Sequence, residues 1–339
     1  MRYAELLGKK VKHDIVHQGL VLVPAGVLLD LHHIQLLENY RIDPEEILLL
    51  GETIPSAEAE SETAVTMAQA VRFTREMFER IREIGQLDPE EIEHTLVPMI
   101  MQISENKDMF QLFKTVRAKD EYTHQHNIGV SVLSTLIGRW LGWSEEAVAL
   151  LSLAASLHDV GKVRISDEIL LKPGKLTAEE YAEMKRHTEY GYEILKANAG
   201  IHPRVALVAL QHHERGDGGG YPRGIRSDQM DIMSRVVAVA DIFHAMSSRR
   251  PYHEPMPFYR VVNEMRAGAF GELDPYIVSV FLDQIIRHLV GRRVKLSDGR
   301  WGEVVYIDPH EDMHPLVRVG TTFVDLKQER QLHVVEIIV

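Results

Sequence analysis

The pattern of hydrophobic and polar positions divides the chain into segments of different character. Residues 1–52 mix short apolar runs, broken by glycines and a proline, with a helical stretch in which Leu31, Ile34 and Leu37 share a face. The run "EEILLL" at its end predicts a further strand. We therefore expect a small α+β module at the start of the chain.

From residue 53 to about residue 290, apolar residues recur with helical period. Helix starts are marked by Asp88 and Asp274, each followed by a proline, and by Thr177 with Glu180 three residues later, the spacing of a capping box. Residues 61–85 predict one long helix whose apolar face comprises Val65, Ala68, Val71, Met77, Phe78 and Ile81.

After Gly291 the period changes to two, and Asp298-Gly299 is typical of a hairpin turn. The predicted fold is mainly α, with a small α+β module at 1–52 and a small β unit at 291–339. Between them we expect a linker and helical stalk at 53–117 and an all-helical domain at 118–290. The long helices of the stalk could pair in a homodimer.

Composition narrows the function classes. The chain has 45% hydrophobic and 26% charged residues, as a soluble globular protein does, and its net charge of −12 argues against binding long nucleic acid. It contains no cysteine, so a metal has to be held by His, Asp or Glu. No run is apolar enough for a membrane span, and the first residues lack a signal region. We expect a cytoplasmic protein.

The candidate metal ligands are histidines and aspartates at the ends of successive predicted helices. The segments "LLSLAASLHDVGK" and "RVVAVADIFHAM" are strongly apolar, yet each carries a carboxylate into a buried place. Burying such groups costs several kcal/mol, about 2–7 for an unpaired polar group, unless they are paired or bind metal. The candidate ligands are His126, His158, Asp159, His187, His212, His213 and Asp241.

This set is large enough for two metal ions. His126, His158, Asp159 and Asp241 could surround one ion, and His187, His212 and His213 a second, with Asp159 bridging. Nitrogen and oxygen donors of this kind suit two divalent ions, with iron or manganese favoured and nickel or zinc as alternatives. Two such ions favour hydrolysis of a phosphoester by a bridging hydroxide.

The motifs "YTHQH", "LHDVGK", "MKRH", "HHERGDGGGYPRG" and "VADIFHAMSSRRPY" occur in this order over about residues 105–290. They resemble the HD-GYP subgroup of the HD-domain metal-dependent phosphohydrolases. The resemblance implies an all-α core with metals between helices, and hydrolysis of cyclic di-GMP to pGpG, in some members onward to GMP.

The resemblance also implies roles for further residues. Asp159 and Lys162 would be catalytic, with Lys162 on the scissile phosphate, and Arg250 would bind phosphate. Gly220, Tyr221 and Pro222 match the signature loop beside the site. Glu214 could orient either a ligand histidine or this loop.

The sequence also departs from the family pattern. Tyr122 stands where members with a third metal have a glutamate, which favours two ions, although Glu121 is adjacent. His244 and Arg249 replace usual aspartates, and His253 occupies a usually basic position. These changes leave the ligand set whole but could alter substrate affinity. His124 is outside the ligand register, and we expect it to be exposed or to contact a ligand.

Two alternatives to a cyclic di-GMP phosphodiesterase remain open. One is a non-catalytic module that senses cyclic di-GMP, which the changes at His244 and Arg249 motivate. The other is a hydrolase of a different cyclic dinucleotide, such as a cyclic GMP-AMP hybrid. The flanking modules are expected to act as scaffold or dimer surfaces, or to receive a signalling partner.

Overall fold

A computed structural model describes residues 6, 9–17, 20–29, 31–40, 42–43, 47, 57–106, 108–116, 122–248, 256–269, 271–308 and 314–337. The chain separates into two compact units, Met1–Glu60 and Ser61–Val339. The finer four-part division expected from the sequence stays a prediction.

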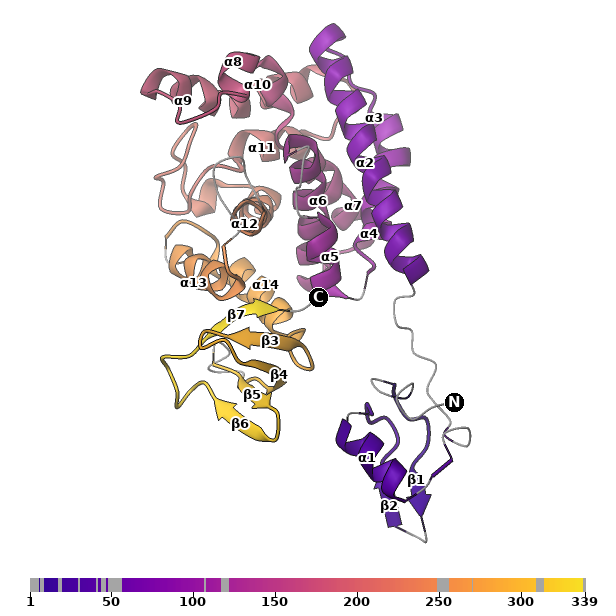
Figure 1. The fold of residues 1–339 in the computed structure, drawn as a ribbon. Helices are drawn as coiled ribbons and strands as arrows, with labels where there is room; N and C mark the ends of the chain where they lie inside the picture. The colour runs from indigo at the N-terminus through magenta and orange to yellow at the C-terminus, as the bar shows by residue number, and fades with distance from the viewer. Residues whose placement is uncertain are drawn as a thin grey trace. The chain divides into compact units, whose positions relative to one another are not determined.

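The first unit is a small α+β module with its own core (Figure 1). Strands β1 (Ile15–His17) and β2 (Leu20–Val23) form an antiparallel pair, and α1 (Leu31–Asn39) follows. Ile34 and Leu37 of α1 are buried in a cluster with apolar residues of the strands, as their spacing predicted. The strand expected at "EEILLL" falls almost wholly outside the described residues.

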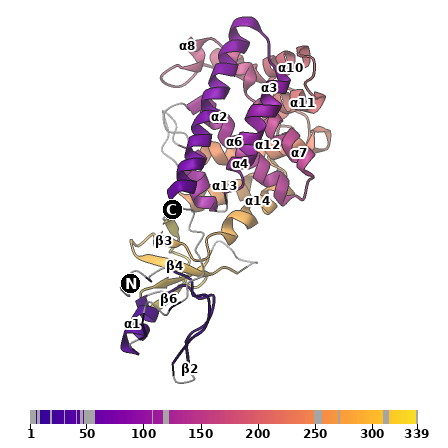
Figure 2. The same ribbon diagram turned by 90° about the vertical axis from the view of Figure 1, so that its right-hand side faces the viewer.

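The second unit is built mainly from helices (Figures 1 and 2). They are α2 (Ala57–Ile84), α3 (Pro89–Glu91), the π-helix η2 (Ile92–Leu96), α4 (Val97–Ile103), α5 (Met109–Val116), α6 (Tyr122–Trp140), α7 (Glu145–Ser156), the 3-10 helix η3 (Val160–Arg164), α8 (Asp167–Leu170), α9 (Ala178–Lys185), α10 (His187–Ala197), α11 (Pro203–Gln211), the 3-10 helix η4 (Ser227–Gln229), α12 (Ile232–Ser247), α13 (Phe258–Gly268) and α14 (Pro275–Arg287). None of the described helices is long and apolar enough to cross a membrane.

The expected helix starts are present. The Asp88 side chain accepts a hydrogen bond from the backbone of Glu91, and Thr177 and Glu180 form the predicted capping box. Asp274 caps α14 by accepting from the backbone nitrogens of Tyr276 and Ile277. These signals are local, since the capping atoms lie within three residues of each other, which is why the pattern predicted them.

The apolar face of α2 differs from the predicted one. Met77, Phe78 and Ile81 are buried as expected, but Val65 and Ala68 are exposed. Thr66, Met67, Ala70 and Thr74 are buried instead. Thr74 can face the core because its hydroxyl donates to the carbonyl of Ala70 at 2.9 Å. The prediction did not count the threonines and overlooked Met67 and Ala70, and so displaced the first part of this face.

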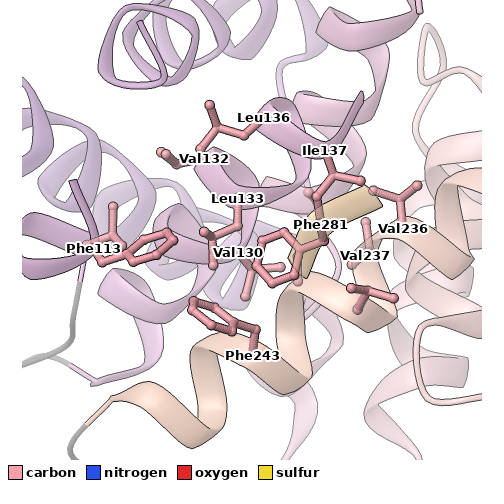
Figure 3. Close-up of a cluster of buried hydrophobic side chains, with 14 of the residues drawn as sticks. Phe113, Val130, Val132, Leu133, Leu136, Ile137, Val236, Val237, Phe243 and Phe281 are labelled. Carbon is pink, nitrogen blue, oxygen red and sulfur yellow. The ribbon is translucent and has the colours of Figure 1, made fainter. Parts of the chain in front are cut away.

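The centre of the helical core lies where α6, α12 and α14 meet (Figure 3). Phe243 of α12 packs edge-on against Phe281 of α14, with ring centroids 4.8 Å apart, and the α6 side chains Leu133 and Ile137 belong to the same cluster. Burying aromatic rings of this size dominates the energetics of a core. The packing fixes α6 and α12, the two helices that carry His126 and Asp241.

The second unit ends in a five-stranded antiparallel sheet of order β6-β5-β4-β3-β7. The strands are β3 (Arg293–Leu296), β4 (Trp301–Tyr306), β5 (Leu316–Val319), β6 (Thr322–Asp325) and β7 (Val334–Ile337). Gly299 has φ of 89° in the turn between β3 and β4, the hairpin expected at Asp298-Gly299. Inward residues such as Val294 and Val304 join the core of the helices. The predicted fold class is confirmed.

Candidate metal centre

Helix α7 delivers His158 and Asp159 into the interior. Its N-cap, Ser144, accepts a hydrogen bond from the backbone of Ala147, and its interior is rich in buried apolar residues. The helix ends at Ser156, so His158 and Asp159 fall in the turn before η3. Both side chains are almost completely buried. The pair is therefore buried at the end of an apolar helix, in the turn that follows it.

Gly161 allows helix α10 to pack closely against this turn. A Cβ atom at Gly161 would lie 1.9 Å from the carbonyl oxygen of His187 and 2.4 Å from the backbone nitrogen of Gly191. Any side chain at this position would separate η3 from α10. Because they touch, Nε2 of His187 lies 3.3 Å from Oδ1 of Asp159.

Three histidine rings are oriented by the same kind of hydrogen bond, from a ring nitrogen to a backbone carbonyl. The ring Nδ1 atoms of His158, His187 and His212 lie 2.7, 2.8 and 3.0 Å from the carbonyl oxygens of the residues three positions earlier. A carbonyl can only accept, so each Nδ1 carries the hydrogen and each Nε2 keeps a lone pair. All three residues lie at helix ends, where carbonyl groups lack helical partners.

Asp159 is the point on which the predicted ligands converge. Its Oδ1 lies 3.3 Å from Nε2 of His187 and 3.8 Å from Nε2 of His212, and its Oδ2 lies 3.4 Å from Nε2 of His158. Oδ2 also lies 3.9 Å from Nε2 of His126. One carboxylate thus faces histidines of both predicted ion sites.

His126 and Asp241 complete the cluster from α6 and α12. Nε2 of His126 lies 3.0 Å from Oδ1 of Asp241, and Nδ1 of His213 lies 3.9 Å from Oδ2. The structure therefore brings all the predicted ligand residues into one buried cluster. His213 is the most accessible of them, with 30% of its side chain exposed.

The electrostatics of the cluster favour neutral imidazoles and ionised carboxylates. Burial lowers the pKa of His187 to about 4 and that of His213 to about 3. Burial would raise the pKa of Asp159, but Lys162 and the surrounding histidines hold it well below its usual range. The pKa of Asp241 is likewise held well below its usual range, against burial, by the neighbouring His126 and His213. These are the protonation states in which both residue types bind metal.

The donor set fits divalent metal ions. Two groups have all their donor atoms within 4.8 Å of one another, namely Asp159 with His187, His212 and His213, and His126 with His158 and Asp159. Within the described part of the chain, Nε2 of His158 and Oδ1 of Asp159 are buried and make no hydrogen bond. Buried polar atoms seldom lack a partner, so a cation is the partner that explains them. Asp159 belongs to both groups.

Lys162 lies beside this carboxylate. Its Nζ is 2.5 Å from Oδ2 of Asp159, and its side chain is 20% exposed. The ammonium group thus sits between the buried donors and solvent, where it provides a positive charge at the edge of the cluster. Arg250, the other residue expected on the phosphate, lies outside the described residues, as do Arg249, His253 and Glu121.

A protein-family model described as "HD domain" matches residues 102–277, just over half of the chain. The chain belongs to the HD domain family. The match runs from the end of α4 to the start of α14 and contains the whole cluster. The resemblance expected from the motifs is confirmed.

Named relatives are similar to this chain over part of its length. A "Cyclic di-GMP phosphodiesterase" of Thermotoga maritima is 43% identical over 179 residues, covering 51% of this chain and 49% of the relative. A "3'3'-cGAMP-specific phosphodiesterase 2" of Vibrio cholerae is 36% identical over 176 residues, covering 52% and 34%. The chain spans about half the length, or less, of these curated relatives.

One similar structure is "Bd1817, a HDG"Y"P protein from Bdellovibrio bacteriovorus". It aligns with a TM-score of 0.55 at 16% identity and covers 84% of this chain and 98% of the other. At this identity the likeness concerns the fold alone. It supports the mainly helical architecture predicted for this chain.

The glycine-rich loop of the HD domain is fixed from within by Glu214. The two carboxylate oxygens of this buried residue accept hydrogen bonds from the backbone nitrogens of Arg223 and Ile225, at 2.7 and 3.1 Å. Of the two roles considered for Glu214, the geometry matches orientation of the loop. A Cβ at Gly220 would lie 2.3 Å from the backbone nitrogen of Arg215, so the close packing of the loop leaves no room for a side chain at this position.

The loop ends beside the histidines. The peptide bond between Tyr221 and Pro222 is cis, and the Tyr221 ring stacks on the His213 ring with centroids 4.7 Å apart. Nζ of Lys185, from α9, lies 5.8 Å from the centre of the Tyr221 ring. Tyr221 and Lys185 therefore form a wall next to the most accessible donor, His213.

Sequence reasoning missed two contacts of the HD domain. Lys185 was not singled out, although its position two residues before His187 is a signal that it lies near the site. His244 was noted only as an unusual residue, yet its Nδ1 lies 3.0 Å from Nδ1 of His126. His124 contacts Phe78 of α2 edge-on, with ring centroids 5.4 Å apart.

Proposed function

We propose that this chain is a metal-dependent phosphodiesterase that hydrolyses cyclic di-GMP to linear pGpG at a dinuclear site. The observation that carries the proposal is the position of Asp159, whose two oxygens face both groups of histidines. The relatives named as cyclic di-GMP phosphodiesterases supply the substrate class. Iron or manganese is the expected metal, with nickel or zinc as alternatives.

When bound, two divalent ions supply Lewis acidity toward a phosphodiester and lower the pKa of water. The residues proposed to hold them are His126, His158, Asp159, His187, His212, His213 and Asp241. Histidine binds a metal as a neutral ligand, so the set supplies two negative charges, from Asp159 and Asp241. A loaded site is therefore cationic and attracts an anionic substrate, although the chain as a whole carries −12.

Lys162 and the loop are proposed to position the substrate. Lys162 pairs with Asp159, and it can turn to a phosphate oxygen when that carboxylate serves as a ligand. Tyr221 and Lys185 offer an aromatic face and a cation at the rim, which suit a nucleobase and a phosphate. Arg250, Gly220 and Pro222 stay predicted substrate contacts.

The test is product analysis with purified, metal-loaded protein. The full chain is prepared without oxygen, its iron and manganese are measured, and cyclic di-GMP is added. We expect pGpG to appear, and the time course shows whether GMP follows. If the loaded protein binds cyclic di-GMP but releases neither product, the chain is a binding module and the proposal is wrong.

A second substrate is favoured by the similarity to 3'3'-cGAMP-specific phosphodiesterases at 36–40% identity. Competition between cyclic di-GMP and 3'3'-cGAMP in one assay distinguishes the two. We expect cyclic di-GMP to be consumed faster. The cytoplasmic location, the homodimer and a signalling partner stay predictions.

A further inference from the structure

His126 is held differently from the other histidines of the cluster. It lies within α6, where backbone carbonyl groups accept helical hydrogen bonds, so a carbonyl of its own helix is not free to orient it. Its Nδ1 faces Nδ1 of His244 at 3.0 Å instead. His244 belongs to α12 and is 1% exposed, and His126 is 3% exposed.

The direction of this hydrogen bond follows from the other side of the His244 ring. Nε2 of His244 lies 2.9 Å from the carbonyl oxygen of Val116. A carbonyl only accepts, so Nε2 of His244 carries a hydrogen, and in the neutral ring Nδ1 is an acceptor. His126 therefore donates through its Nδ1. Its Nε2, which faces Asp241 and Asp159, is the atom left for a cation.

We propose that His244 is a positioning residue, which holds His126 in the tautomer and orientation that present Nε2 to a metal ion. It does for His126 what backbone carbonyls do for His158, His187 and His212. The inference rests on the metal-binding part of the proposed function and is independent of the substrate.

Helix α6 is built to admit the His244 ring. A Cβ atom at Gly129, three residues after His126, would lie 2.2 Å from Nε2 of His244 and 2.5 Å from its Cδ2. The glycine leaves the space that the ring fills. The ring is thus located by a carbonyl of α5, a histidine of α6 and a gap in the same helix, and the hydroxyl of Ser248 lies further away, 3.4 Å from each ring nitrogen. A side chain that merely filled volume would not require these contacts.

The test compares substitutions at His244 by their effect on metal affinity. His244→Phe keeps an aromatic ring but removes the Nδ1 acceptor for His126. We therefore expect one of the two Mn²⁺ ions to bind about 10- to 100-fold more weakly. His244→Asn restores an acceptor near Nδ1 and His244→Asp restores a charged one. We expect Asn to recover most of the affinity and Asp to reach or exceed that of the original chain.

Mn²⁺ affinity and stoichiometry are measured by competition with a fluorescent chelator, and the coordination is followed through the visible spectrum of the Co²⁺-loaded protein. Ile285→Val is the control, since it weakens the core through α14, a helix that contributes no residue to the cluster. We expect it to lower the melting temperature and leave both affinities unchanged. If His244→Phe does not fold, Gly129→Ala, which displaces the ring, must give the same weakened site.

The inference is wrong if His244→Phe binds two ions as tightly as the original chain, or if the Asn and Phe variants lose affinity equally. It also fails if the original chain binds fewer than two ions. An original chain that binds two Mn²⁺ ions but leaves cyclic di-GMP intact would overturn the proposed phosphodiesterase activity alone, because the His244 comparison needs no turnover.

Discussion

The two faces of the metal cluster are oriented by different means. On the face formed by α7, η3, α10 and α11, His158, His187 and His212 are each fixed by a carbonyl group three residues earlier in the chain. On the face formed by α6 and α12, His126 is fixed by a side chain 118 residues away. The first face is organised by helix ends and the second by tertiary packing.

The difference predicts how each face responds to change. A helix end keeps its geometry as long as the helix forms, whereas the contact of His126 with His244 depends on the packing of α6 against α12 around Phe243 and Phe281. Asp159 connects the faces, since its oxygens reach histidines of both. Substitutions can therefore be sorted by whether they affect one face or both.

Asp159→Asn is expected to have the largest effect, because it removes the charged group common to both faces. We expect the affinity for Mn²⁺ to fall on the order of 1,000-fold at both positions, since removing one member of a buried charged set costs about 3–5 kcal/mol. Hydrolysis of cyclic di-GMP should become undetectable. Calorimetric titration with Mn²⁺ and product analysis measure the two effects.

The control for this substitution is Asp167→Asn, which removes an exposed carboxylate paired with Arg82 at 3.1 Å. Surface pairs contribute about 0–1 kcal/mol, so this variant should bind metal and turn over normally. If Asp159→Asn loses only one of the two ions, the carboxylate is not shared by the two ion positions, and the role proposed for it is wrong.

The same division explains what the sequence could predict. Caps such as Asp88 and Thr177 and the position of Asp159 after an apolar helix depend on neighbouring residues, so the pattern indicated them. The partnership of His126 with His244 depends on how two distant helices cross, and one sequence does not encode that crossing in any local signal. The buried face of α2 was displaced for a related reason, because the tertiary neighbours of this helix decide which side is covered, and they bury Thr66 and Thr74 while Val65 stays exposed.

Lys162→Met is expected to separate metal binding from catalysis. Methionine keeps a side chain of similar length but removes the charge, so both Mn²⁺ ions should still bind. Turnover should fall about 100- to 1,000-fold if Lys162 stabilises charge on the phosphate. Steady-state kinetics of the loaded protein measure this. The control is Arg164→Met, which removes an exposed cation paired with Glu193. If turnover falls equally in both variants, Lys162 has no specific role in catalysis.

The stability of the metal-free chain should depend on pH through the buried histidines. The pKa of His187 is about 4 in the folded chain, whereas an unperturbed histidine titrates near 6.5. The unfolded state thus binds more protons at this residue between these values, so the contribution of His187 to the free energy of unfolding should fall by about 3 kcal/mol as pH drops from 6.5 to 4. Urea unfolding in EDTA across this range measures the slope.

His187→Gln should remove a corresponding part of that slope, and His94→Gln, at an exposed position of η2, should leave it unchanged. Both variants are compared with the original chain in the same buffers. A slope that persists in full in His187→Gln would assign the pH dependence to other groups, and would weaken the description of the α10 histidine as buried and neutral.

The smallest expected effect concerns His213, which is the most exposed member of the cluster and is held by the stacked ring of Tyr221. Stacking of this kind contributes about 1 kcal/mol, so Tyr221→Leu should weaken Mn²⁺ binding roughly five-fold, with the other ligands compensating. Tyr221→Phe keeps the ring and should bind Mn²⁺ normally. A Phe variant as weak as the Leu variant would show that the hydroxyl group, rather than the stacked ring, supports this edge of the site.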